Sequence, residues 1–220
     1  MDKLLTVVIP SYNVEKFLNQ TLDSFVCDEA VMKKFEVIVV DDGSKDSTAK
    51  IGKEYADKYP DTFRVISKEN GGHGSTINCG IRNAVGKYFK VVDGDDWVNT
   101  ADFVKLVEDL EKTESEYVFT NYNEYYDDVN RQKSVDFPQF KDGTEYDFAD
   151  VANKVYIPMH ALVIKTSVLK DNNIVIDEKC FYVDVEYVMF PVPFVNKVTF
   201  FDLHVYMYLS LIHISEPTRR

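Results

Sequence analysis

Four short apolar runs, each followed at once by polar residues, constrain the fold of this chain more than any other feature. They are residues 4–10, 35–40, 63–67 and 88–92. The first two are near-continuous apolar runs, which are typical of strands that are buried on both faces of a parallel sheet. The segments between them carry apolar residues at helical spacing. Strands that alternate with helices indicate a doubly wound α/β fold, in which helices flank a mostly parallel central sheet.

The polar residues that follow these runs should gather on one edge of the sheet, because ligands of open parallel sheets bind beyond the carboxyl ends of the strands. Each cluster also has a purely structural explanation, since aspartate and serine cap helices and Asp-Gly pairs form turns. Asn13, for example, is expected to cap the helix after the first strand. Four such clusters on one edge nevertheless favour a shared ligand site. They are Ser11 and Asn13, Asp41 and Asp42, residues 68–74, and Asp93, Asp95 and Asp96.

The stretch Asp93-Gly94-Asp95-Asp96 places three carboxylates within four residues. Like charges this close shift one another's pKa unless a cation or a hydrogen-bond donor neutralises them. Carboxylates without histidine or cysteine beside them in the sequence suit Mg²⁺ or Mn²⁺, and Mg²⁺ completes its shell with water and substrate phosphate. The stretch therefore predicts a divalent cation that carries a diphosphate. An EF-hand does not fit, because its later glycine and its glutamate would fall on Val98 and Val104.

Charge and cysteine content exclude several other classes of protein. The net charge of −12 argues against a nucleic-acid-binding surface and against a broad basic face for anionic lipid. The cysteines Cys27, Cys79 and Cys180 are odd in number and far apart, so we expect buried thiols in a reducing compartment. The chain shows neither a signal-peptide layout nor an apolar run long enough to span a bilayer. A cytoplasmic globular protein is the expectation.

No linker separates the first half of the chain, residues 1–112, from the second half, residues 113–210, which mixes aromatic strand-like stretches with short helices. We therefore expect one domain over residues 1–210. The last ten residues, LIHISEPTRR, follow an apolar strand without turn residues and resemble a translated sequencing adapter. We expect residues 211–220 to be a non-native tail and the natural protein to continue past Ser210.

Four segments carry a resemblance to a known family. TVVIPSYNVEKFL, EVIVVDDGSKDST, ENGGHGSTINCGI and GKYFKVVDGDDWV, in this order, resemble family-2 glycosyltransferases, which are inverting enzymes of the GT-A fold. The resemblance covers nearly all of residues 4–209. It implies a nucleotide-sugar donor, most often UDP-linked, a divalent cation, and hexosyl transfer to an acceptor hydroxyl. It also implies a glycan or lipid-linked precursor of a bacterial cell-surface polysaccharide as acceptor, with peripheral association at the inner face of the membrane.

The resemblance assigns the first half to the nucleotide sugar and the second half to the acceptor, and it carries over individual residues. Where many members have Ala-Arg-Asn, this chain has Thr76-Ile77-Asn78. The diphosphate contact of the missing arginine would then come from Arg82 or from the metal alone. The implied nucleotide-binding residues are Pro10, Ser11, Asn13, Asp41, Asp42, Asn70, Gly71, Gly72, Asp93 and Asp95, and the implied metal ligands are Asp95 and Asp96.

The resemblance also points to a catalytic base. Many members carry Glu-Asp after an aromatic stretch, and here Asp184 occupies the aspartate position with Val183 before it. An inverting transfer needs one carboxylate to take a proton from the acceptor hydroxyl. Glu186 is the reserve: in a strand it would share the face of Asp184, and in a helix it would not. His73 could touch phosphate or be a surface-loop histidine, and His160 could line the acceptor side or be semi-buried.

Two other functions fit parts of the pattern. One is a catalytically silent module that binds a nucleotide sugar or a partner. The other is a nucleotidyltransferase, which also clusters carboxylates, although it usually has a basic glycine-rich loop near its N-terminus and VIPSYN contains no lysine or arginine.

Overall fold

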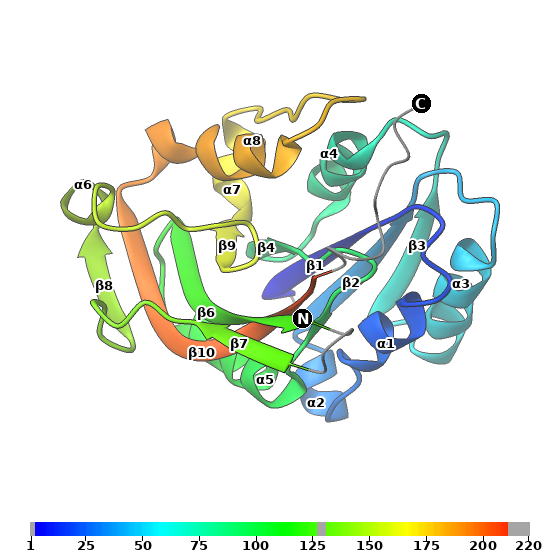
Figure 1. Ribbon diagram of the computed structural model, residues 1–220, viewed down its shortest axis with the longest axis horizontal. Helices are drawn as coiled ribbons and strands as arrows, with labels where there is room; N and C mark the ends of the chain where they lie inside the picture. The colour runs from blue at the N-terminus through cyan, green and yellow to red at the C-terminus, as the bar shows by residue number, and fades with distance from the viewer. Residues whose placement is uncertain (1–2, 127–130, 211–220) are drawn as a thin grey trace.

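One ten-stranded sheet runs through both halves of the chain in the computed structural model, which describes residues 3–126 and 131–210 (Figure 1). The main path of the sheet is β3-β2-β1-β4-β9-β6-β10-β5, with β7 on β6 and β8 on β10. The expected non-native tail, residues 211–220, lies outside the described residues. The α/β prediction, with a mostly parallel central sheet flanked by helices, is confirmed.

The four apolar runs of the first half form the parallel part of the sheet. β1 pairs with β2 and β4, and β2 pairs with β3, all in parallel. Every residue of β1 and β2 is buried, as their apolar runs predict, and so is every residue of β4. β3 lies at the end of the strand order, and only Phe63 in it is fully buried. The elements are β1 (Leu5–Ser11), α1 (Leu18–Asp23), α2 (Glu29–Met32), β2 (Phe35–Asp41), α3 (Thr48–Lys58), β3 (Phe63–Ser67), α4 (His73–Asn83) and β4 (Tyr88–Val91).

The second half extends this sheet with strands of both directions. β9 lies antiparallel between β4 and β6, and β10 runs parallel to β6. The elements are β5 (Trp97–Val98), α5 (Thr100–Asp109), η1 (Leu110–Lys112), β6 (Tyr117–Tyr126), β7 (Arg131–Val135), β8 (Thr144–Asp147), α6 (Phe148–Val151), β9 (Leu162–Lys165), α7 (Thr166–Asp171), α8 (Val183–Met189), η3 (Val192–Phe194) and β10 (Lys197–Leu209).

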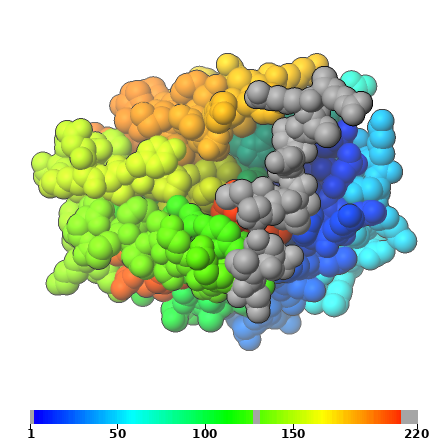
Figure 2. Space-filling model, viewed as in Figure 1, coloured from blue at the N-terminus to red at the C-terminus, as the bar shows by residue number. Residues whose placement is uncertain are grey.

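Two apolar cores lie on the two faces of the sheet. Because neighbouring strand residues point to opposite faces, Val8 belongs to one core and Val7 and Ile9 to the other. The first core packs α4, α7 and α8 on the side drawn uppermost in Figure 1, and the second packs α1, α3 and α5. In Figure 2 the blue and cyan residues of the first half occupy the right of the molecule, and the yellow-green to orange residues of the second half its left and top.

Two local predictions are wrong. Asn13 does not cap a helix: α1 begins only at Leu18, and the Asn13 side-chain oxygen accepts a hydrogen bond from the Lys45 amide at 2.9 Å, which ties the loop after β1 to the loop after β2. The three cysteines are not all buried either. Cys79 is buried, but Cys27 is half-buried and Cys180 is exposed.

Gly86 tests how closely α4 and the start of β4 approach β1. A Cβ at Gly86 would lie 2.5 Å from the Leu5 carbonyl carbon and from the Thr6 nitrogen, and backbone atoms cannot move aside. We expect Gly86→Ala to lower the free energy of unfolding in urea by about 1–3 kcal/mol, as overpacking does. Gly143→Asn is the control, because that site is open and its positive φ suits asparagine. Equal losses in the two variants would contradict the close approach.

Candidate functional site

A cavity of about 440 Å³ opens at the carboxyl ends of β1 and β4. It brings together Pro10, Asp93 and Asp95 from the first half with Asp184 from the second. His73 and His160, for which the sequence left the role open, also line it. The strand-end carboxylates therefore face an open cleft that both halves of the chain enclose.

The acidic loop after β4 is fastened to β10. The Tyr206 hydroxyl donates to one oxygen of Asp96 at 2.5 Å, and the Leu209 amide donates to the other at 2.6 Å. The same hydroxyl accepts a hydrogen bond from the Asp93 amide at 3.2 Å. Asp96 is consequently only 2% exposed and lies behind the cavity, whereas Asp95 lines it. The antiparallel pairing of β5 with β10, which sets Val98 opposite Tyr206, brings these groups together.

The three carboxylates have different electrostatic environments. Burial works to raise the pKa of Asp93, but the charge and the hydrogen bond of His73, at 2.7 Å, outweigh it and lower that pKa. Burial and the neighbouring charge of Asp93 raise the pKa of Asp95. Burial and the charges of Asp93 and Asp95 raise the pKa of Asp96 well above its usual range. Burial and mutual repulsion thus disfavour full ionisation of the loop unless a cation or further donors compensate its charge.

This donor set fits a divalent cation. Asp93, Asp96 and His160 can each offer one ligand atom, and these atoms all lie within 4.8 Å of one another. Carboxylate oxygens with one imidazole suit Mn²⁺, and carboxylates with water suit Mg²⁺. The sequence prediction assumed that no histidine lies near the carboxylates. That assumption is wrong, because the fold brings both His73 and His160 to the acidic loop. The assignment of Asp95 as a ligand stays a prediction.

His160 is held in an aromatic setting. Its ring centroid lies 4.8 Å from that of Tyr208 and 4.9 Å from that of Tyr206. Burial lowers the pKa of His160, which favours the neutral imidazole that a metal requires. Lys90, fully buried beneath it, donates to the carbonyl oxygens of His160 and Leu162 at 2.8 and 3.2 Å. The loop before β9 is thereby fixed to β4.

The loops after β2 and β3 form a braced corner around Asp42. Its carboxylate accepts hydrogen bonds from the amides of Gly71 at 3.0 Å and Gly72 at 2.8 Å, and from the Lys68 ammonium at 2.6 Å. The side-chain amide of Asn70 donates to the backbone carbonyl of Asp42 at 3.0 Å. Both oxygens of this side chain therefore have protein partners, and Asp42 acts as an internal brace of the corner.

Other predicted nucleotide-binding residues lie in or beside this corner. Ser11 ends β1, is buried, and its carbonyl accepts the Asp42 amide at 2.9 Å. Asp41 ends β2 and accepts the Ser44 amide at 3.0 Å. Pro10 reaches the cavity, and its carbonyl accepts the Gly94 amide at 3.1 Å. Their contacts to a nucleotide stay predictions.

Asp184 and Glu186 point to different faces of one helix. Residues 183–189 form α8, so the strand alternative for this segment is wrong and the two side chains do not share a face. Asp184 lines the cavity, while the Glu186 carboxylate accepts the Asp177 amide at 2.8 Å. The geometry brings Asp184 to the acidic loop and gives Glu186 a structural partner.

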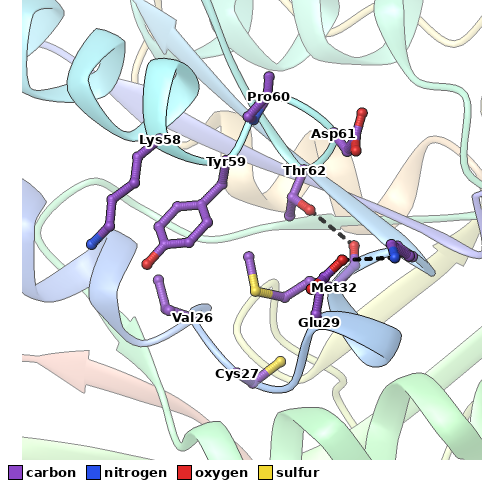
Figure 3. Close-up of a pocket in the computed structure, with 10 residues that line it drawn as sticks. Val26, Cys27, Glu29, Met32, Lys58, Tyr59, Pro60, Asp61 and Thr62 are labelled. Atoms are coloured by element: carbon purple, nitrogen blue, oxygen red, sulfur yellow. Dashed lines mark hydrogen bonds and ion pairs between the residues drawn. The ribbon is translucent and has the colours of Figure 1, made fainter.

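Two other cavities do not belong to this site. Arg82 lines one with Leu169 and Lys170, so it is not placed to replace the missing arginine. The other, of about 400 Å³, lies before the amino ends of β2 and β3, at the sheet edge opposite to Asp93. Figure 3 shows it between Tyr59 and Met32, where the Thr62 hydroxyl donates to the Met32 carbonyl at 3.0 Å.

The sheet order, with an acidic cleft at its carboxyl edge, defines an α/β domain of the GT-A fold class. A model of glycosyl transferase family 2 matches residues 6–172, and the chain belongs to this family. It is 38% identical over 118 residues to the uncharacterized glycosyltransferase EpsJ of Bacillus subtilis, covering 54% of this chain and 33% of that protein. It is 33% identical over 111 residues to the minor teichoic acid biosynthesis protein GgaB of the same species, covering 50% and 12%.

Solved structures show the same fold. S. aureus TarS 1–349, crystallised in complex with UDP-GlcNAc, superposes with a TM-score of 0.78 at 24% identity, over 94% of this chain and 58% of that one. The mannosyltransferase PcManGT from Pyrobaculum calidifontis, in complex with GDP-Man and Mn²⁺, gives a TM-score of 0.67 at 18% identity, over 100% and 59%. This chain thus spans a third or less of the two curated relatives and somewhat over half of these structures. Among the described residues, no helix is long and apolar enough to cross a membrane.

Tyr206 tests whether the acidic loop depends on β10. Tyr206→Phe removes the donor to Asp96 and the acceptor for the Asp93 amide. We expect the free energy of unfolding to fall by about 1–3 kcal/mol in urea denaturation, because a buried polar group loses its partner. Tyr208→Phe is the matched control on the same strand, and its change should stay within about 0.5 kcal/mol. A loss no larger in Tyr206→Phe than in the control would refute this dependence.

Proposed function

We propose that this chain transfers a sugar, with inversion, from a nucleoside-diphosphate donor to an acceptor hydroxyl, and that a UDP-sugar with a divalent cation is the donor. One observation carries the proposal: Asp184 lines the same cleft as Asp93 and Asp95, although it comes from the opposite half of the chain. Membership of glycosyl transferase family 2 supports it. Inverting transfer requires a general base that can reach the acceptor hydroxyl in the same cleft that holds the cation and the diphosphate.

Asp93, Asp95, Asp96 and His160 would hold the Mg²⁺ or Mn²⁺, which when bound supplies positive charge beside the departing diphosphate. The nucleoside would lie against the strand ends beside the braced corner, where Pro10, Ser11, Asn13, Asp41 and the Asn70 loop stand. Asp42 keeps that corner in shape through its bonds to the Gly71 and Gly72 amides.

Asp184 would act as the general base. Its carboxylate takes the proton of the acceptor hydroxyl while the oxygen attacks the anomeric carbon from the face opposite the diphosphate. The new glycosidic bond forms as the bond from that carbon to the diphosphate oxygen breaks. Glu186 is the weaker candidate, because its carboxylate accepts the Asp177 amide and α8 turns it away from the face of Asp184.

The acceptor would be a glycan or a lipid-linked precursor of a bacterial cell-surface polymer, used in the cytoplasm or at the inner face of the membrane. The similarity to GgaB, which is named for minor teichoic acid biosynthesis, supports this class of acceptor. The fold shared with TarS, which was crystallised with UDP-GlcNAc, supports a UDP-linked donor.

Asp184→Asn tests the base. In assays with Mn²⁺ across a panel of UDP- and GDP-sugars, we expect its turnover to fall about 10²–10⁴-fold, the contribution typical of a general base. Its affinity for the nucleotide should stay unchanged in calorimetry, because the substitution keeps the shape of the side chain. Glu186→Gln, the matched control, should keep turnover within a few-fold of wild type. Nucleotide binding without turnover in wild type would instead favour a catalytically silent module.

Removal of the cation tests the role of the acidic loop. We expect EDTA, or Asp95→Asn in the presence of Mn²⁺, to weaken UDP binding at least about tenfold, because the diphosphate would then meet uncompensated carboxylates. Asp57→Asn, which changes an exposed carboxylate paired with Lys53 on α3, should leave binding unchanged. Full-strength UDP binding in the presence of EDTA would contradict the assignment of a cation to the acidic loop.

A further inference from the structure

The cleft that would receive a diphosphate has no lysine or arginine among its described lining residues. Two lysines near the strand ends are already bonded within the protein. The Lys68 ammonium bonds to Asp42 and to the Ser75 hydroxyl, and Lys90 bonds to backbone carbonyls. Arg82 lines a different cavity. Of the described side chains that can carry positive charge, only His73 and His160 line the cleft.

His73 is the one of these two that hydrogen-bonds a carboxylate. Its Nε2 lies 2.7 Å from Asp93 Oδ1, and because an ionised carboxylate can only accept, Nε2 carries the hydrogen. Among the described residues, no donor contacts the other oxygen, Asp93 Oδ2. The bond therefore fixes the orientation of the carboxylate and leaves one of its oxygens available to a ligand.

The backbone around His73 is itself tightly placed. Gly72 has a φ of +85°, which turns the chain into the first residue of α4. A Cβ at Gly74 would lie 2.0 Å from the Asp177 carbonyl oxygen, so the start of the helix is pressed against the loop that leads to α8. The Thr76 hydroxyl donates to the His73 carbonyl at 2.6 Å. The imidazole is thus presented to Asp93 from a fixed support.

Helix geometry explains why His73, and not a residue one turn later, has this place. Ile77 is four positions on and lies on the same stripe of α4, but it is fully buried in the core that α4 shares with α8. A charged side chain at position 77 would have no access to the cleft. The first residue of the helix is the one on this stripe that reaches the acidic loop.

We propose that His73 is a positioning residue of the donor site: its Nε2–H holds the Asp93 carboxylate in the orientation that receives the cation and its diphosphate. This inference rests on the proposed function. Hydrogen-bond partners of metal-binding carboxylates typically change metal affinity 10–100-fold when they are removed. His73 would act through Asp93 and would not touch the sugar itself.

The test is calorimetric titration of the whole chain with Mn²⁺ alone. We expect His73→Ala to weaken Mn²⁺ binding about 10–100-fold and His73→Gln, which keeps a side-chain donor, to restore it to within a few-fold of wild type. His204→Ala is a matched control, because His204 makes the same kind of bond, 2.6 Å from Asp136 Oδ1, away from the cleft. Its Mn²⁺ affinity should equal that of wild type.

Three results would overturn the inference: wild-type Mn²⁺ affinity in His73→Ala, no recovery in His73→Gln, or unfolding of His73→Ala at the assay temperature, which would mark a structural role. Failure of the proposed function has a different signature. Wild type would then bind Mn²⁺ and respond to these substitutions, yet transfer no sugar from any donor of the panel.

Discussion

The crowding of Asp93, Asp95 and Asp96 at the end of β4 is the constraint on which the rest of the structure depends. Three carboxylates in one turn repel one another, and burial makes that repulsion stronger. The protein opposes it with donors that come from more than 100 residues later in the chain, the Tyr206 hydroxyl and the Leu209 amide. The native shape of the acidic loop therefore depends on the place of β10 in the sheet. A bound cation would relieve the repulsion that these donors leave uncompensated.

A second carboxylate on the same sheet edge, Asp42, has its charge compensated within the protein. Asp42 receives two backbone amides and the Lys68 ammonium, so its charge is matched by the protein alone. Asp95, two strands away, faces the cleft with burial and the charge of Asp93 raising its pKa. The two aspartates look alike in the sequence, since each follows an apolar strand and lies beside a glycine. These two residues differ in the number of donors around them, and those donors come from other segments.

This distinction explains how much the sequence could predict. The apolar runs indicated β1 to β4, and parallel strand geometry converts their ends into one edge, so the clustering of the carboxylates followed from local pattern. The helical state of residues 183–189 did not, because a short apolar run fits a strand or a helix equally well and tertiary packing decides between them. For His73 and His160 the sequence left the role open. They join the site through the β4–β9 pairing and the start of α4, and only the composition of the glycine-rich loop hinted at His73.

The two walls of the cleft differ in how firmly they are held, and the proposed chemistry gives that difference a purpose. The donor wall is braced at Asp42, Asp96 and Gly94, where hydrogen bonds and close backbone approach leave little freedom. The wall that carries Asp184 enters α8 through Phe181, 88% exposed, and Tyr182, 82% exposed and held at a φ of +65°. A non-glycine residue in the left-handed region costs conformational energy, and exposed segments with few buried contacts are the ones that open at low cost. Stabilising a departing diphosphate needs fixed dipoles and charges, whereas admitting an acceptor needs a wall that can yield. Under the proposed function, the braced donor wall would meet the charge of the diphosphate, and the exposed start of α8 would border the acceptor.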